Sequence, residues 1–389
     1  MSFSFAFDVA ADELDDELDL PAAVDQLSLG ESPQASTSTT AVPHKEVPFS
    51  ELLETLPPLL SYTPVTVPLS SSPSRHVSLL RRDLFDARFQ VLNQDDDEGE
   101  DGEALPKDKG KQKEELFIDE QTDLVKGVYE GGLKTWECSL DLVDCLDERG
   151  FKVDEDLVTA RVRGKSVLEV GCGTAVPSCA LFARLLNEIR KAPTETDAPR
   201  PPKTRLHLQD YNKQVLTLIT LPNLLLTYAL HLASPDAAPD ADEETSSPEP
   251  GELEVTPEFL ESFESLLERE NIELRFFEGD WSGMDAAVRK EAEGYDLVLT
   301  SETVYSVPSL EPLLDLLEAA SEAKEESTCL VACKRIYFGV GGGELEFRRR
   351  VEERGGKVEA VWGDGEGKGK NSGVGRTVMS VKWKGKEKQ

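Results

Sequence analysis

Apolar residues recur along this chain in two alternating patterns. Short, nearly continuous apolar runs predict buried strands at 166–170, 206–209, 273–277, 295–300 and 328–333. Apolar residues at helical spacing predict helices at 136–149, 175–191, 214–232, 259–270, 285–292, 309–323 and 344–355. Residues 357–362 and 377–383 predict a closing antiparallel pair of strands. Strands that alternate with helices indicate an α/β fold, with a mostly parallel sheet and helices on both faces.

This pattern predicts that the folded domain begins near Leu116 and runs to residue 389. Residues 1–115 are acidic, and we expect them to be mostly disordered, with short ordered elements near 47–92. Within those elements, 47–60 has helical spacing and 77–92 predicts a strand and a short helix. The like-charge run 95–103 predicts a linker, and the acidic, Pro/Ser-rich stretch 234–257 predicts a disordered insertion in the domain.

The charge balance is strongly acidic, with 76 Asp and Glu against 42 Lys and Arg and a net charge of −34. Such a chain repels nucleic acid and anionic membranes, so we expect a basic protein as its partner. The acidic residues could equally serve to keep unfolded segments soluble. The apolar stretch at 216–233 contains Pro222 and Asn223, which indicates a core helix rather than a membrane span.

The six cysteines form no CxxC pair, and no histidine lies near enough to complete a zinc pattern, so we predict no metal site. Their helical spacing is typical of small buried side chains. The chain starts with an acidic segment rather than a basic and then apolar one. We therefore expect reduced thiols and a cytoplasmic and nuclear location.

The segment from Ser166 to Thr174, SVLEVGCGT, carries the strongest functional signal. A strand, a tight turn with Gly171 and Gly173, and the start of a helix bring backbone N–H groups close to a ligand. A dinucleotide-binding turn would have a third glycine where Val176 stands, and no phosphate-binding loop is present. S-adenosylmethionine, which also needs close backbone approach, is the remaining common ligand of such a turn.

Polar and aromatic residues follow the next three predicted strands. The runs are Gln209-Asp210-Tyr211-Asn212, Gly279-Asp280-Trp281 and Ser301-Glu302-Thr303-Val304-Tyr305. An acid after the second strand can bind ribose hydroxyls, and an acid beside an aromatic ring can hold an adenine. A buried Trp and a helix-capping Asp are the alternative readings of single fragments. Fragments at four successive strand ends are hard to explain by packing alone.

Together with residues 131–139, 220–223 and 337–343, these motifs resemble the histidine protein methyltransferases of the seven-strand, S-adenosylmethionine-dependent class. The resemblance runs from about Leu116 to Trp383. It implies a Rossmann-like class I methyltransferase fold with a C-terminal antiparallel strand. It also implies transfer of a methyl group to a ring nitrogen of a histidine in a large-subunit ribosomal protein.

The motifs and the resemblance give two sets of candidate site residues. The expected cofactor-binding residues are Thr135, Trp136, Glu137, Cys138, Ser139, Glu169, Gly171, Cys172, Gly173, Gln209, Asp210, Tyr211, Asn212, Gly279, Asp280, Trp281 and Ser301. The expected substrate-binding residues are Tyr337, Phe338, Gly339, Gly341, Gly342 and Gly343. Glycines in the second set would let the substrate backbone approach closely, although a loop that only needs positive φ angles has the same composition.

The implied reaction needs little base catalysis. An imidazole with a pKa of about 6.5 is largely neutral at cytosolic pH, whereas a lysine with a pKa of about 10.4 must first lose a proton. Alignment of nucleophile and methyl in a desolvated pocket should dominate. Glu302 and Tyr305 are the catalytic candidates, with Glu302, or Asp210 through water, contacting the other ring nitrogen. Glu302 could equally cap the next helix.

Two other functions stay open from the sequence. A protein-lysine methyltransferase belongs to the same superfamily, and a non-catalytic acidic escort of a basic ribosomal protein belongs to another class. A nucleic-acid methyltransferase is disfavoured by the charge and by the lack of an Asn/Asp-Pro-Pro-Tyr/Phe run after the fourth strand. We expect a monomer, as is usual for this architecture.

Overall fold

The computed structural model describes residues 42–72, 74–83, 85, 87, 132–151, 161–192, 200–233, 248–291, 294–324, 326–338, 341–363 and 375–383. They all belong to one compact unit, Ala41–Gln389. The acidic start at 1–41 and the linker predicted at 95–103 lie outside the described residues.

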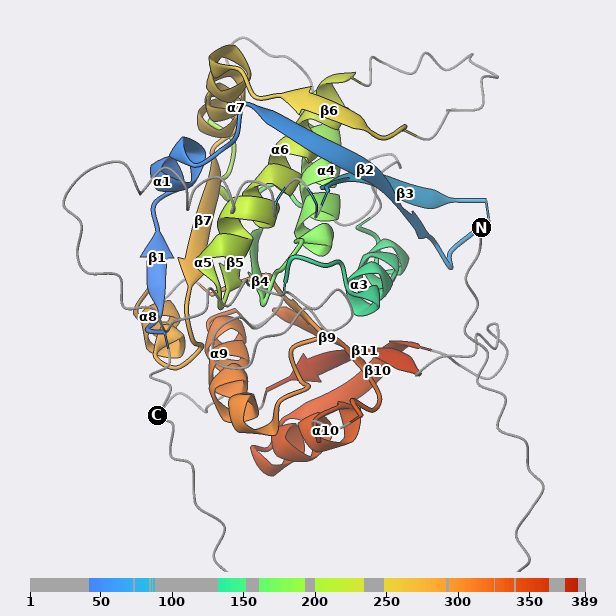
Figure 1. Ribbon diagram of the computed structural model, residues 1–389. Helices are drawn as coiled ribbons and strands as arrows, with labels where there is room; N and C mark the ends of the chain where they lie inside the picture. Colours follow the sequence, from blue (N-terminus) through green and yellow to red (C-terminus); the bar gives the residue numbers. More distant parts are fainter. Residues whose placement is uncertain are drawn as a thin grey trace, which may run out of the picture. The chain divides into compact units, whose positions relative to one another are not determined.

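The main sheet has eight strands in the order β1-β7-β5-β4-β8-β9-β11-β10 (Figure 1). Its parallel centre comprises β4 (Ser166–Val170), β5 (Thr204–Asp210), β7 (Ile272–Glu278), β8 (Leu297–Ser301) and β9 (Thr328–Lys334). The predicted closing pair, β10 (Lys357–Gly363) and β11 (Arg376–Lys382), is confirmed, and β11 runs antiparallel to β9. The chain moves from β4 to one side and then returns to the other, so the carboxyl end of β4 is the switch point where ligands bind.

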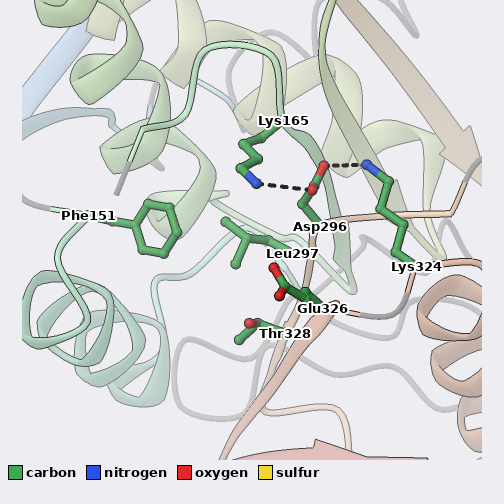
Figure 2. A pocket seen from close by; sticks show the side chains of 7 residues that line it. All are labelled: Phe151, Lys165, Asp296, Leu297, Lys324, Glu326 and Thr328. Atoms are coloured by element: carbon green, nitrogen blue, oxygen red, sulfur yellow. Dashed lines mark hydrogen bonds and ion pairs between the residues drawn. The ribbon is translucent and has the colours of Figure 1, made fainter. Parts of the chain in front are cut away.

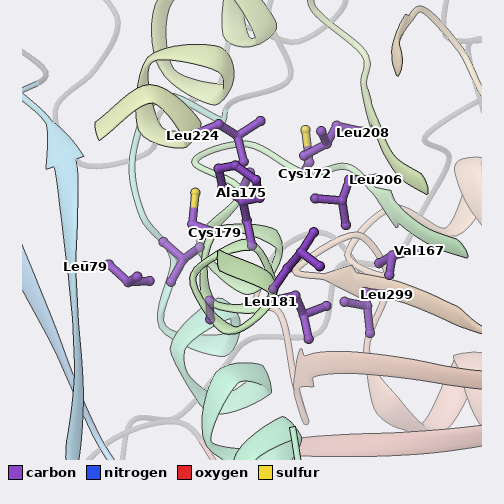
Figure 3. Close-up of a cluster of buried hydrophobic side chains, with 14 of the residues drawn as sticks. Leu79, Val167, Cys172, Ala175, Cys179, Leu181, Leu206, Leu208, Leu224 and Leu299 are labelled. Carbon is purple, nitrogen blue, oxygen red and sulfur yellow. The ribbon is translucent and has the colours of Figure 1, made fainter. Parts of the chain in front are cut away.

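Helices cover both faces of this sheet because alternate strand residues point to opposite sides. Val167 and Leu299 join the core under α3 (Glu137–Glu148), α4 (Val176–Arg190), α6 (Leu221–Ala233) and α7 (Pro257–Arg269), part of which is drawn in Figure 3. Leu168 and Val298 join the core under α8 (Met284–Glu291), α9 (Leu310–Glu322) and α10 (Glu344–Glu353). The predicted three-layer α/β fold is therefore confirmed. All six cysteines are buried and free, as their spacing indicated.

The apolar helix after β5 is a core element. It consists of α5 (Lys213–Val215), a π-helical turn (Leu216–Thr220) and α6. By length and composition the whole helix could cross a membrane, but 78% of its most apolar window is buried inside the domain. The Thr220 hydroxyl donates to the carbonyl of Gly173 at 2.7 Å, and the Asn223 amide donates to that of Thr174 at 2.8 Å. These two hydrogen bonds therefore hold the glycine turn against this helix.

A second, three-stranded sheet contains β3 (His76–Arg82), β2 (Leu59–Pro68) and β6 (Gly251–Glu254), in that order. It lies across α4 and α6 (Figure 1), where the buried Arg82 donates through its guanidinium to the carbonyl of Leu218 at 2.9 Å. The helix expected at 47–60 is shorter, α1 (Phe49–Glu54), because Pro57 and Pro58 prevent its extension into β2.

The N-terminal boundary and the insertion differ from the prediction. The domain begins well before Leu116, because β1 (Lys45–Val47) pairs antiparallel with β7 at the sheet edge. The insertion expected to be disordered over 234–257 contains β6, which pairs with β2. The Thr256 side chain then caps α7, accepting from the Phe259 N–H at 3.2 Å. Both strands owe their order to distant partners, which local composition does not reveal.

Candidate active site

The glycine turn after β4 lies at the switch point of the sheet. Gly171 and Gly173 have φ angles of 62° and 51°, in the left-handed region that favours glycine. A Cβ on Gly171 would lie 2.5 Å from Cγ2 of Thr303, and one on Gly173 would lie 3.2 Å from the carbonyl oxygen of Gly132. Backbone conformation and close neighbours therefore both require glycine here.

Glu169 and Cys172 lie behind this turn. The Glu169 carboxylate is 1% exposed and accepts hydrogen bonds from the N–H, at 2.9 Å, and the hydroxyl of Ser178 in the first turn of α4. Burial raises the pKa of this carboxyl to about 7, although the Ser178 bonds act in the opposite direction. The Cys172 N–H donates to the carbonyl of Gln209 at 2.8 Å. Of the predicted cofactor-binding residues, these two hold the start of α4 and the turn in place.

The side chain of Gln209 joins three predicted pieces of the site. It is fully buried, and its amide oxygen accepts from the Gly171 N–H at 3.1 Å and from the Trp281 indole N–H at 2.8 Å. Its amide nitrogen donates to the carbonyl of Gly279 at 2.8 Å. The glycine turn and the loop after β7 are thus fixed relative to each other, and the half-buried indole is held in one orientation.

Asp210 ends β5 directly beside the turn. Its carboxylate accepts from the Gly173 N–H at 2.9 Å and from the Asn212 N–H at 3.1 Å. The side chain is buried, and the half-buried ring of Tyr211 follows it. This is the position at which nucleotide-binding sheets place an acid for ribose hydroxyls.

A segment before β1 lies against the same edge, which sequence reasoning missed. The Asp280 N–H donates to the carbonyl of Val42 at 2.8 Å, and the Val42 N–H donates to the Tyr211 hydroxyl at 3.4 Å. A Cβ on Gly279, which has a φ of 98°, would lie 2.3 Å from the carbonyl oxygen of Pro43. Residues 42–44 therefore form an outer wall for the two loops that were predicted to bind the ribose and the adenine.

The end of β8 carries a second polar cluster. The Tyr337 hydroxyl donates to Oε2 of Glu302 at 2.6 Å, and the Lys334 ammonium lies 3.4 Å from Oε1. The ring centres of Tyr305 and Tyr337 lie 6.3 Å apart, and the two rings are tilted relative to each other. Burial and the Glu302 charge raise the pKa of the Tyr337 phenol, so it remains a hydrogen-bond donor. Tyr337 thus contacts both catalytic candidates, Glu302 and Tyr305. Lys334 was missed, although it directly follows the strand predicted at 328–333.

Residues 135–139, at the start of α3, connect the glycine turn with the Glu302 cluster. The Thr135 hydroxyl lies 3.2 Å from that of Thr174 in the glycine turn. The Lys334 ammonium lies 4.8 Å from the ring centre of Trp136 and 3.3 Å from the Glu137 carboxylate. Of the other two predicted residues in this segment, Cys138 is buried, and the Ser139 hydroxyl donates to the carbonyl of Trp136 at 2.7 Å.

Gly341 and Gly342, from the predicted glycine-rich segment, pack on the loop that follows β8. The Gly342 N–H donates to the carbonyl of Tyr305 at 3.1 Å, and a Cβ on Gly342 would lie 2.2 Å from that oxygen. Gly341 forms a bridge with Ser306. Phe338 is 79% exposed, and the predicted Gly339 lies outside the described residues. The glycine-rich loop thus borders the Glu302 cluster, on the side where we expect the substrate.

A separate pocket at the opposite, amino-terminal ends of β4, β8 and β9 is not part of this site (Figure 2). It is lined by Phe151, Lys165, Asp296, Leu297, Lys324, Glu326 and Thr328. Asp296 forms ion pairs with Lys165, at 3.2 Å, and Lys324, and it accepts the Ser166 N–H at 2.8 Å. These bonds tie strand ends together, and none of the predicted site residues lines this pocket.

Comparison with known proteins decides the family. No protein-family model matches the chain. Histidine protein methyltransferase 1 of Schizosaccharomyces pombe is 35% identical over 298 residues, which are 76% of this chain and 75% of that protein. The Saccharomyces cerevisiae protein of the same name is 31% identical over 372 residues, covering 91% of both chains.

The chain belongs to the histidine protein methyltransferase 1 family. It is an S-adenosylmethionine-dependent histidine protein methyltransferase, and the family resemblance of its motifs is confirmed. A solved structure of a putative S-adenosylmethionine-dependent methyltransferase from Streptococcus mutans is 12% identical, with a TM-score of 0.35, over 65% of this chain and 51% of that one.

The residues at the carboxyl edge fit this cofactor. The side chains at the ends of β5 and β7 offer a carboxylate, at Asp210, and an indole that the buried Gln209 amide holds in place. The left-handed Gly171 beside them allows close approach of a ligand to the backbone. We propose that Asp210 binds the ribose, that Asp280 and Trp281 bind the adenine, and that the glycine turn borders the amino-acid part. S-adenosylmethionine supplies an electrophilic methyl group on a sulfonium.

Proposed function

We propose that this methyltransferase modifies a histidine in a basic protein of the large ribosomal subunit. The net charge of −34 supports a basic substrate, because opposite charge accelerates encounter between proteins. The ribosomal identity rests on the motif resemblance described above. The family membership supports the choice of histidine.

The Glu302 cluster suits a neutral imidazole as the nucleophile. The Tyr337 hydroxyl, the Tyr305 ring and the Trp136 ring lie near one buried carboxylate at the end of β8. Such walls exclude water and restrict a planar ring to few orientations. Because imidazole is largely neutral at cytosolic pH, these residues mainly need to orient the ring toward the methyl group.

The proposal is tested by incubating the purified chain with labelled S-adenosylmethionine and separated large-subunit ribosomal proteins, followed by mass spectrometry of the labelled band. We expect methylhistidine in a single basic protein. A Gly171→Arg variant, which fills the glycine turn, serves as the matched control and should give no label. Methyllysine would instead indicate the lysine-specific alternative.

A binding experiment distinguishes the enzyme from the non-catalytic escort. If the chain only carries a basic protein, the Gly171→Arg variant should still bind that protein, and the wild type should bind it without methylating it. For the enzyme, we expect methylation whose KM rises with ionic strength, because salt screens the attraction between the acidic chain and its basic substrate. A KM that is independent of salt would contradict the charge argument.

A further inference from the structure

Glu302 has an unusual backbone conformation at a functional position. Its φ angle is 58°, in the left-handed region that residues other than glycine rarely adopt. Its N–H donates to the carbonyl of Ala332 in β9 at 2.9 Å, which holds the residue in this conformation. Strain of this kind persists where the surrounding structure enforces it, and it clusters at active sites.

The carboxylate of Glu302 is buried with one oxygen incompletely satisfied. Its side chain is 8% exposed, and Oε2 accepts the Tyr337 hydroxyl at 2.6 Å. Within the described residues, Oε1 accepts no hydrogen bond. The Lys334 ammonium lies 3.4 Å from it, and the weakly donating thiol of Cys138 lies beside the carboxylate. A buried carboxylate oxygen without a donor is costly, so this oxygen suits a donor that arrives with the substrate.

The neighbours of Glu302 cannot replace it as an acceptor. Burial and the Glu302 charge raise the pKa of the Cys138 thiol, which therefore stays protonated. Burial disfavours the Lys334 ammonium, but the Glu302 and Glu137 carboxylates outweigh this effect and raise its pKa. The cluster around Oε1 is therefore composed of donors, and Glu302 is its buried acceptor.

We propose that Oε1 of Glu302 accepts the N–H of the substrate imidazole and thereby selects which ring nitrogen is methylated. This inference rests on the histidine substrate described above. A neutral imidazole has one N–H and, across the ring, one nitrogen with a free lone pair. An N–H anchored at Glu302 leaves the lone pair on the opposite side of the ring, free to attack the methyl group. Tyr337 is a positioning residue that fixes the carboxylate.

The same contact assists the transfer. The lone pair of the free nitrogen forms the new bond to the methyl carbon, while the carbon–sulfur bond breaks and its electron pair stays on sulfur. The ring thereby gains a positive charge, which the Glu302 carboxylate stabilises. The N–H proton then passes through Glu302 to solvent, leaving neutral methylhistidine. A lysine ammonium held by the same carboxylate would have no lone pair, which favours histidine as the acceptor.

The test compares Glu302→Gly and Tyr337→Phe with the wild type. Glycine adopts the left-handed conformation without strain, so the first variant removes the carboxylate while keeping the backbone. The purified chains are incubated with S-adenosylmethionine and total cell protein, and the two methylhistidine isomers and methyllysine are quantified after hydrolysis. Glu322→Gln and Tyr295→Phe are matched controls away from the site. Cofactor affinity is measured separately by calorimetry.

We expect Glu302→Gly to lose roughly 100-fold in rate while cofactor affinity changes less than about twofold. Its residual product should contain both ring isomers, and added formate should restore part of the rate. Tyr337→Phe should lose roughly tenfold, as expected for one hydrogen bond to a charged group. An unchanged rate or an unchanged isomer in Glu302→Gly would overturn the inference.

The outcomes also separate this inference from the substrate proposal. Methylhistidine in a protein outside the ribosome would contradict the ribosomal substrate and leave the role of Glu302 intact. Wild-type protein that forms methyllysine and no methylhistidine would overturn both.

Discussion

The burial of Glu169 predicts a pH dependence of stability that can be calculated. Burial raises the pKa of this carboxyl to about 7 from an ordinary value of 4.5. Between these two pH values the folded state keeps a proton that the unfolded state has released, so stability falls as pH rises. The loss is absent below about pH 4.5 and complete above about pH 7. From pH 5 to pH 8, the free energy of unfolding should fall by roughly 2.5 kcal/mol through this group.

Comparison with Glu169→Gln isolates this contribution. Urea unfolding of both proteins at pH 5, 6, 7 and 8 gives the difference in free energy of unfolding, from which the other titrating groups largely cancel. The wild type should lose stability relative to the variant as pH rises. In Ser178→Ala the loss should continue to higher pH, because the bonds that favour the ionised carboxylate are gone. A difference that stays constant within about 0.5 kcal/mol from pH 5 to pH 8 would refute the reasoning.

Two further substitutions test the glycine turn and the glycine-rich loop independently. Gly171→Ala strains a left-handed residue and places a Cβ 2.5 Å from Cγ2 of Thr303. It should weaken S-adenosylmethionine binding roughly tenfold by calorimetry, and unchanged affinity would contradict the close fit of the turn. Gly342→Ala places a Cβ 2.2 Å from the carbonyl oxygen of Tyr305. Its kcat/KM should fall roughly 100-fold at unchanged cofactor affinity. A parallel loss of cofactor affinity would contradict the assignment of this loop to substrate binding.

The sequence predicted the parallel sheet and the polar residues at its carboxyl edge because both depend on local patterns. The apolar run of β8 is continuous, and that of β4 is interrupted only by Glu169, because these strands are buried on both faces. The polar residues that follow them, such as Glu302, necessarily reach the carboxyl edge. Lys334 could have been found in the same way, since it directly follows the apolar run of β9.

The elements that were missed depend on contacts between distant residues. β1 is three residues long and becomes a strand by pairing with β7, more than 200 residues later in the chain. The segment before it reaches the loop after β7 because Gly279 has no side chain to block the Pro43 carbonyl. Neither the short strand nor a lone glycine carries a local signal of this contact.

Two acids that were both predicted to bind the cofactor show how position along a strand affects a role. Glu169 and Asp210 both lie near the ends of adjacent parallel strands, and sequence reasoning assigned both to the cofactor. Asp210 is the last residue of β5 and reaches the glycine turn, whereas Glu169 lies one residue before the end of β4 and faces Ser178 in α4. Both side chains lie on the same face of the sheet, because Glu169 pairs with Leu208 and alternate strand residues share a face. Asp210 lies two residues beyond Leu208 and past the end of β4, where it bonds to the glycine turn, whereas Glu169 lies within the sheet and supports the helix that packs on it. The position of an acid relative to the end of the neighbouring strand, which follows from the strand register, therefore decides between these two roles.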